Sequence, residues 1–100
     1  MRILIQNKIT QSRYEQVITI MKKRGAPIIE CYVLSDDIYY ALEGSHRVTA
    51  AKELGLTPIL DVIAEINSEP DDDELYRAWI DSKARVTKGL FIDFNHQNTC

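Results

Sequence analysis

The amino-acid sequence predicts one α/β domain over residues 1–100, in which helices pack on a small mixed sheet. A chain of 100 residues has the length of a single domain with one core. Hydrophobic residues make up 45% and charged residues 27%, proportions typical of globular proteins. Runs rich in Ile, Val and Tyr alternate with segments whose apolar residues recur at helical spacing. This alternation indicates the α/β class.

The first two elements are a strand and a helix. Residues 2–5, "RILI", are typical of a short strand. Ser12 and Glu15 have the spacing of a capping box, which predicts that a helix begins at Ser12. Gly25 and Pro27 mark its end. The apolar stripe of this helix is expected at Tyr14, Val17, Ile18 and Met21.

A β-hairpin, a second helix and a third pleated segment are predicted next. Two apolar runs between residues 27 and 44 are separated by Ser35-Asp36-Asp37, whose types favour a turn. The second arm ends at Gly44, and Gly55 ends the helix that starts at Ser45. The apolar positions of that helix are Val48, Ala51 and Leu54. Residues 57–66 form the third pleated segment.

The last helix follows the acidic run at 71–74, "DDDE", and a short strand is expected within residues 90–94. Carboxylates in a first turn complement the positive end of the helix dipole. A divalent-metal site is the alternative, although adjacent carboxylates point around a helix and do not converge. Tyr76 and Trp79 cover the sheet or form a homodimer contact. The apolar stripe is Leu75, Ala78 and Trp79.

The charge and the hydropathy limit the partners and the location. The net charge is −3 and the pI about 5.3, which excludes a chain-wide basic field for nucleic acid. Lys22, Lys23 and Arg24 either complement the helix dipole or form a local basic face for DNA. We expect no membrane segment, and a cytoplasmic protein, because no apolar run approaches about 20 residues. Cys31 and Cys100 are expected to be reduced.

The stretch Glu43 to Arg47 carries the candidate site. Gly44 allows a sharp turn or a close approach to a ligand, and the helix after it presents unpaired N–H groups that favour an anion. Arg47 lies in the first turn, where a positive charge is unfavourable unless an anion is bound. Ser45 is an N-cap or a phosphate donor. His46 is a phosphate donor, a proton shuttle or a partner of a backbone carbonyl, while Glu43 orients Arg47, holds Mg²⁺ or acts as a base.

The residues from about 5 to 65 resemble the ParB/sulfiredoxin-like superfamily, in particular the N-terminal domain of ParB-type partition proteins. The matching pattern is "G-x-P-I" at Gly25 to Ile28, a hairpin, and then "G-x-x-R-x-x-A-A-x-x-x-G" at 44–55. Residues 69–100, the last helix and the tail, lie outside the resemblance. Ser45 stands where sulfiredoxins carry their catalytic cysteine, so sulfinic-acid reduction is not expected.

The resemblance implies a domain that grips nucleotide phosphates: CTP in partition proteins, ATP in sulfiredoxins, and ADP or ATP in free-serine kinases. Gly44, Ser45, His46 and Arg47 would then line the phosphate site, with Gly25 near the nucleotide. Arg13 would be a second phosphate contact, because Gln11 to Arg13 is similar to the family's "Q-P-R" stretch.

Three functions follow as hypotheses. The first is a nucleotide-binding module with a regulatory or partition-related role, alone or with a partner protein. The second is a phosphotransferase or NTP hydrolase in which Glu43 and His46 act as catalytic groups, with or without Mg²⁺. The third is a DNA-associated protein that acts with a partner. The alternative to all three is that Gly44 to Arg47 form only a capped helix start with a solvent-facing arginine.

Overall fold

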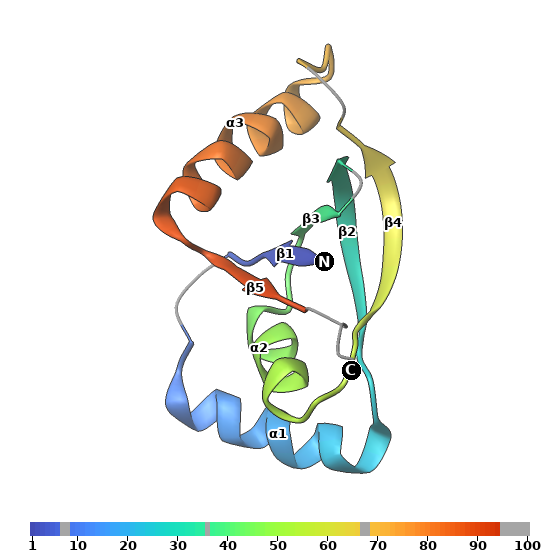
Figure 1. Ribbon diagram of the computed structural model, residues 1–100, viewed down its shortest axis with the longest axis vertical. Helices are drawn as coiled ribbons and strands as arrows, with labels where there is room; N and C mark the ends of the chain where they lie inside the picture. Colours follow the sequence, from blue (N-terminus) through green and yellow to red (C-terminus); the bar gives the residue numbers. More distant parts are fainter. Residues whose placement is uncertain (7–8, 36, 67–68, 95–100) are drawn as a thin grey trace, which may run out of the picture.

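The structure is a computed structural model that describes residues 1–6, 9–35, 37–66 and 69–94. Within them, three helices and five strands form a mixed α/β domain (Figure 1). The elements in chain order are β1 (Arg2–Leu4), α1 (Gln11–Arg24), β2 (Ile28–Ser35), β3 (Ile38–Ala41), α2 (Ser45–Glu53), β4 (Ile59–Glu65), α3 (Asp73–Lys88) and β5 (Phe91–Asp93). The predicted fold class is confirmed.

The five strands form one sheet in the order β4-β2-β3-β1-β5. The predicted hairpin is present, because β2 pairs antiparallel with β3. Each arm of the hairpin also has a parallel neighbour: β1 lies parallel to β3, and β4 lies parallel to β2. The last strand, β5, pairs antiparallel with β1. The sheet is therefore mixed, as the sequence predicts.

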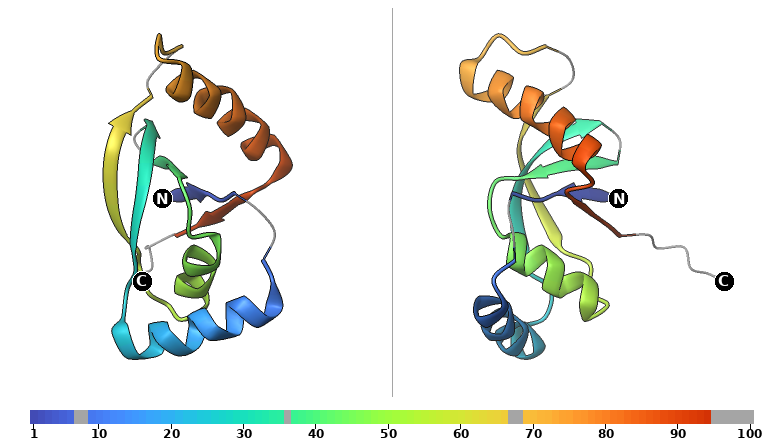
Figure 2. Two further views of the ribbon diagram at one scale, coloured as in Figure 1. Left: turned by 180° about the vertical axis from the view of Figure 1, so that it is seen from behind. Right: turned by 90° about the vertical axis from the view of Figure 1, so that its left-hand side faces the viewer.

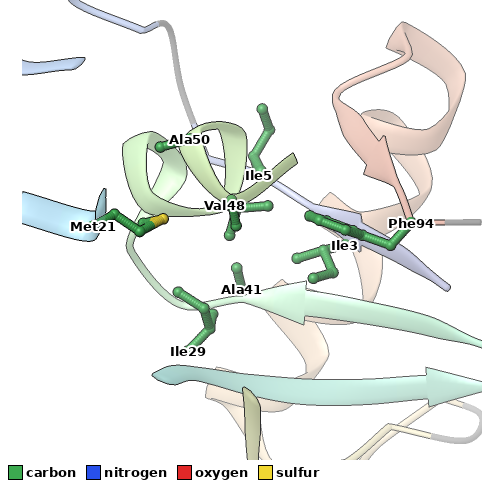
Figure 3. Close-up of a cluster of buried hydrophobic side chains, with 9 residues drawn as sticks. Ile3, Ile5, Met21, Ile29, Ala41, Val48, Ala50 and Phe94 are labelled. Atoms are coloured by element: carbon green, nitrogen blue, oxygen red, sulfur yellow. The ribbon is translucent and has the colours of Figure 1, made fainter. Parts of the chain in front are cut away.

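The sheet buries side chains on both of its faces, because successive residues of a strand point in opposite directions. Ile3 of β1 belongs to a core with Met21 of α1 and Val48 of α2 (Figure 3). The next residue, Leu4, belongs to a second core with Tyr32 and with Ala78 of α3. Figures 1 and 2 show α1 and α2 side by side at one end of the molecule and α3 at the other.

The predicted helical stripes are the surfaces that pack. Met21 is buried and the other stripe residues of α1 are half-buried against the first core; these are Tyr14, Val17 and Ile18. Leu75, Ala78 and Trp79 of α3 pack in the second core, so Trp79 covers the sheet. Gly25, Gly55 and Gly89 follow their helices with positive φ.

Two predicted boundaries are wrong. The helix α1 begins at Gln11 with Thr10 as N-cap and no side-chain cap bond, so Ser12 and Glu15 form no capping box. The second hairpin arm ends at Ala41, and Gly44 serves instead as the N-cap of α2. Among the predicted first-turn acids, Asp72 is the N-cap of α3, and its side chain accepts from the N–H groups of Glu74 and Leu75.

None of the helices within the described residues is both long and apolar enough to cross a bilayer. Cys31 is buried and free, and Cys100 lies outside the described residues. Burial, together with the charge of Asp61, raises the pKa of the Cys31 thiol to about 11.

Candidate functional site

Gly44 forms the junction between the hairpin and α2, in a conformation that requires glycine. Its φ of 88° and ψ of 30° are left-handed, a region that residues with a Cβ adopt only with strain. A Cβ at this position would also lie 3.0 Å from Nη2 of Arg47 and 3.2 Å from Cδ1 of Ile29. The arginine therefore lies directly against the Gly44 backbone, as close approach to a glycine allows.

The side chains of Ser45 and His46 bind the segment that leads into α1. The Oγ of Ser45 accepts a hydrogen bond from the N–H of Gln6 at 3.0 Å. The Nε2 of His46 accepts from the N–H of Thr10 at 2.9 Å. His46 therefore bonds a backbone donor, not the backbone carbonyl considered from the sequence. Both side chains position the start of α2 against the chain that precedes α1.

Arg47 points away from these two contacts, toward the beginning of β2. Its Nη1 donates to the carbonyl oxygen of Ile28 at 3.1 Å. The guanidinium thereby lines a cleft of about 390 Å³ between the end of α1 and the start of β2, together with Arg24 and Gly25. The remaining walls are apolar: Val17, Ile20, Met21, Ala26, Pro27 and Ile28.

The charge in this cleft is positive, and within the described residues neither arginine takes part in an ion pair. The ion pairs among the described residues join the N-terminus to Asp37 and Arg85 to Asp81, and neither involves Arg24 or Arg47. The exposed fractions of Ile20 (53%) and Ile28 (60%) show that the apolar walls remain open to solvent. A cleft with apolar walls and two arginines in its lining suits a ligand that is part apolar and part anionic.

The structure brings some of the predicted site residues together and separates others. Gly25 and Arg47 line the same cleft. Arg13 is exposed on the first turn of α1, twelve residues before Gly25 and therefore about 18 Å away along the helix axis. Glu43 is exposed immediately before Gly44. Its roles as base, orienting group or magnesium ligand stay predictions, as does a phosphate contact at Arg13.

Arg24 was missed as a site residue. In the sequence it belongs to the basic run Lys22-Lys23-Arg24, whose position at a helix end is sufficiently explained by the helix dipole. Its approach to Arg47 depends on how α1 packs beside α2, and no local pattern records that packing.

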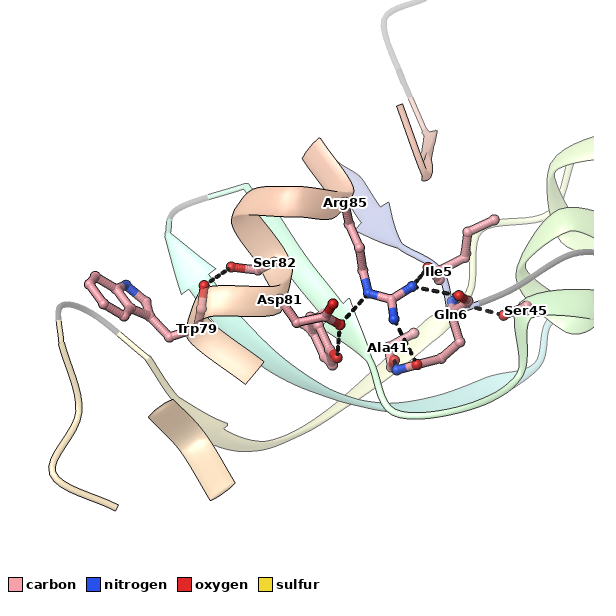
Figure 4. A network of polar contacts seen from close by, with 9 residues as sticks. Ile5, Gln6, Ala41, Ser45, Trp79, Asp81, Ser82 and Arg85 are labelled. Carbon is pink, nitrogen blue, oxygen red and sulfur yellow. Dashed lines mark hydrogen bonds and ion pairs between the residues drawn. The ribbon is translucent and has the colours of Figure 1, made fainter. Parts of the chain in front are cut away.

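A second group of polar residues was also missed, and it joins α3 to the candidate site (Figure 4). Arg85 donates to Asp81 Oδ2 at 2.6 Å, to the carbonyl of Gln6 at 2.6 Å and to Gln6 Oε1 at 3.1 Å. It also donates to the carbonyl of Ile5. Gln6 in turn donates its N–H to Ser45. This chain of bonds joins the segment that follows β1 to both α2 and α3.

Comparison of the chain with protein-family models, with curated proteins and with solved structures finds no match. The resemblance to the ParB/sulfiredoxin-like superfamily therefore rests on the sequence pattern at Gly25 to Ile28 and at residues 44–55.

Proposed function

We propose that this chain binds a nucleoside diphosphate or triphosphate in the cleft between α1 and β2. The phosphates bind Arg24 and Arg47, and the base and sugar pack against the apolar walls. The observation that carries the proposal is the pair of arginines: they line one apolar cleft, and neither has a carboxylate partner among the described residues. Such a pair attracts an anion.

The size and chemistry of the cleft support the same ligand class. Its volume of about 390 Å³ falls in the range of small-molecule sites. A guanidinium offers five N–H donors in a planar fork, and the bond from Arg47 to Ile28 uses only one of them. The remaining donors can bind phosphate oxygens without loss of that bond. The resemblance of residues 44–55 to a phosphate-gripping box adds independent support from the sequence.

A thermal-shift panel tests the proposal. The ligands are ATP, ADP, CTP, GTP and inorganic phosphate, with and without Mg²⁺. A ligand that binds only the folded state stabilises it by about 2.7 kcal/mol when its concentration is 100 times Kd. We expect at least one nucleotide to raise the melting temperature of the wild type and to have little effect on Arg47→Ala or Arg24→Ala.

The matched control is Arg77→Ala, which removes the same charge from α3, away from this cleft. It should keep the wild-type response. A nucleotide response that is equal in Arg47→Ala and in the wild type would refute the assignment of the phosphates to Arg47. The absence of a response to every nucleotide would refute the proposed function itself.

A further inference from the structure

A larger groove lies between α3 and the sheet, in a different part of the molecule from the arginine cleft. Its volume is about 620 Å³. One wall is a face of α3 that carries Asp73, Glu74, Arg77 and Asp81, at the spacing that puts residues on one side of a helix. The stacked tyrosines Tyr32 and Tyr40 of the sheet line it opposite α3. This groove has no role in the proposed nucleotide site.

The groove is acidic. Three carboxylates and one guanidinium line it. Among the described residues, only Asp81 of these four charged groups takes part in an ion pair, and its partner is Arg85. Arg77 lines the same groove but forms no ion pair with Asp73 or Glu74 among the described residues. With three carboxylates against one arginine in its lining, the groove has a net negative charge and therefore a negative potential.

The tyrosines remain neutral, so they act as hydrogen-bond donors to this acidic wall. Burial is the largest cause of the raised pKa of both Tyr32 and Tyr40, and their neighbouring carboxylates add to it. Tyr40 donates to Oδ2 of Asp81 at 2.6 Å, and the hydroxyl of Tyr32 lies 3.5 Å from Glu74. Tyr40 thereby positions the Asp81 carboxylate, Tyr32 makes only a long contact with Glu74, and neither tyrosine brings a charge of its own.

The acceptors that remain in the groove suit a cation with several N–H donors. Both of the hydrogen bonds that Asp81 accepts within the described part of the chain end on Oδ2, which leaves Oδ1 for a further donor. Arg85 is one cation that these groups already bind: its guanidinium bonds Asp81 and Gln6 and lies 5.5 Å from the ring centroid of Tyr40. Leu42 and Ala78 provide apolar surface for an alkyl chain.

We propose that the groove binds an organic cation, an alkylguanidinium or alkylammonium group, with Asp73, Glu74 and Asp81 as its acceptors. The volume exceeds that of a single metal ion and fits a small organic molecule. Such a group occurs in free amines and in the arginine and lysine side chains of a protein. The chemistry of recognition is the same for both sources.

Isothermal titration of the full chain at low salt, followed by two-dimensional NMR, tests the proposal. The probes are agmatine, spermidine and a short arginine-containing peptide. We expect saturable binding with shift changes at the first two turns of α3 and at Tyr32 and Tyr40. Binding of the free amines alone identifies a small-molecule site, whereas binding of the peptide alone identifies a protein-docking site; both outcomes support the cation site.

The decisive variant is Asp73→Asn/Glu74→Gln, which removes the two carboxylates that have no ion-pair partner and leaves the Asp81–Arg85 contact intact. We expect it to weaken binding about fivefold at low salt, the scale of two partly exposed charge contacts. The matched control, Asp61→Asn/Glu65→Gln on β4, removes the same charge away from the groove. Equal losses in the two double variants would mean binding by net charge only and would overturn the proposal. The absence of binding by every probe would overturn it as well.

Discussion

The substitution Gly44→Ala separates the two reasons for a glycine at the start of α2. A Cβ at φ 88° costs about 1–2 kcal/mol for the left-handed backbone alone. It also meets Nη2 of Arg47 at 3.0 Å, and the buried Cδ1 of Ile29 at 3.2 Å blocks the other side. The arginine side chain is the part that can move, so its bond to Ile28 is lost, at a cost of about 1 kcal/mol.

The control is Gly89→Ala, because Gly89 has φ 73° and a Cβ added to it would meet nothing within 4 Å. Urea unfolding should show a loss of about 1–2 kcal/mol for Gly89→Ala and about 2–3 kcal/mol for Gly44→Ala. Gly44→Ala should also weaken nucleotide binding, because Arg47 is displaced from the cleft. Equal destabilisation of the two variants, with unchanged nucleotide affinity, would refute the close packing of Arg47 on Gly44.

Three further predictions concern the interior. Arg85→Met should lower the free energy of unfolding by about 3 kcal/mol, because it removes the donor to the carbonyls of Ile5 and Gln6 and the cationic partner of Asp81. Lys88→Met, on the exposed end of α3, should change the free energy of unfolding little in the same urea titration. Burial acts to raise the pKa of Asp81, but hydrogen bonds from Tyr40 and Arg85 outweigh burial and lower that pKa. Ionised Asp81 therefore stabilises the fold at pH values above its unfolded-state pKa of about 3.9. This stabilisation is lost as the pH falls through the lower folded-state pKa. Urea midpoints between pH 7 and pH 2 should therefore fall more steeply for the wild type than for Asp81→Asn below about pH 4, and parallel curves would contradict this. In a Cys100→Ser background, iodoacetamide should label Cys31 slowly at pH 8 and quickly once urea unfolds the chain, because the buried thiol has a pKa of about 11; rapid labelling of the folded protein would contradict its burial.

The elements that local signals define were predictable from the sequence. The stripe Tyr14 to Met21 repeats at helical spacing, and it packs as that spacing requires. The hairpin follows from two β-rich arms with turn residues between them. Such signals involve residues that are only a few positions apart, so they can be identified from the sequence without knowledge of tertiary contacts.

The start of α1 shows where local reasoning fails. Ser12 and Glu15 have capping-box spacing, yet the helix begins one residue earlier, after Thr10. The N–H of Thr10 donates to His46, 36 residues away in the chain. A long-range contact is thus present at this helix start beside the N-cap preference of Thr10, and the nearby residues do not reveal that contact. The bonds from Arg85 to Gln6, across 79 residues, are hidden from sequence patterns for the same reason.

The candidate site at Glu43 to Arg47 was predicted from residues that are adjacent in the sequence. On a helix, however, the side chains of adjacent residues point in different directions. With 3.6 residues per turn, successive side chains point about 100° apart. Ser45 accordingly contacts Gln6, His46 contacts Thr10, and Arg47 contacts Ile28. In this structure the three consecutive side chains therefore contact three different segments, and their binding to one phosphate stays a prediction. Arg47 acquires its companion from the end of α1 instead, so the cleft is assembled by the packing of α1 beside α2, and the contacts of Ser45 and His46 serve that packing. The substitution His46→Ala removes the acceptor for the N–H of Thr10, so it should weaken nucleotide binding by shifting α1. An unchanged nucleotide affinity in this variant would mean that the cleft forms without that contact.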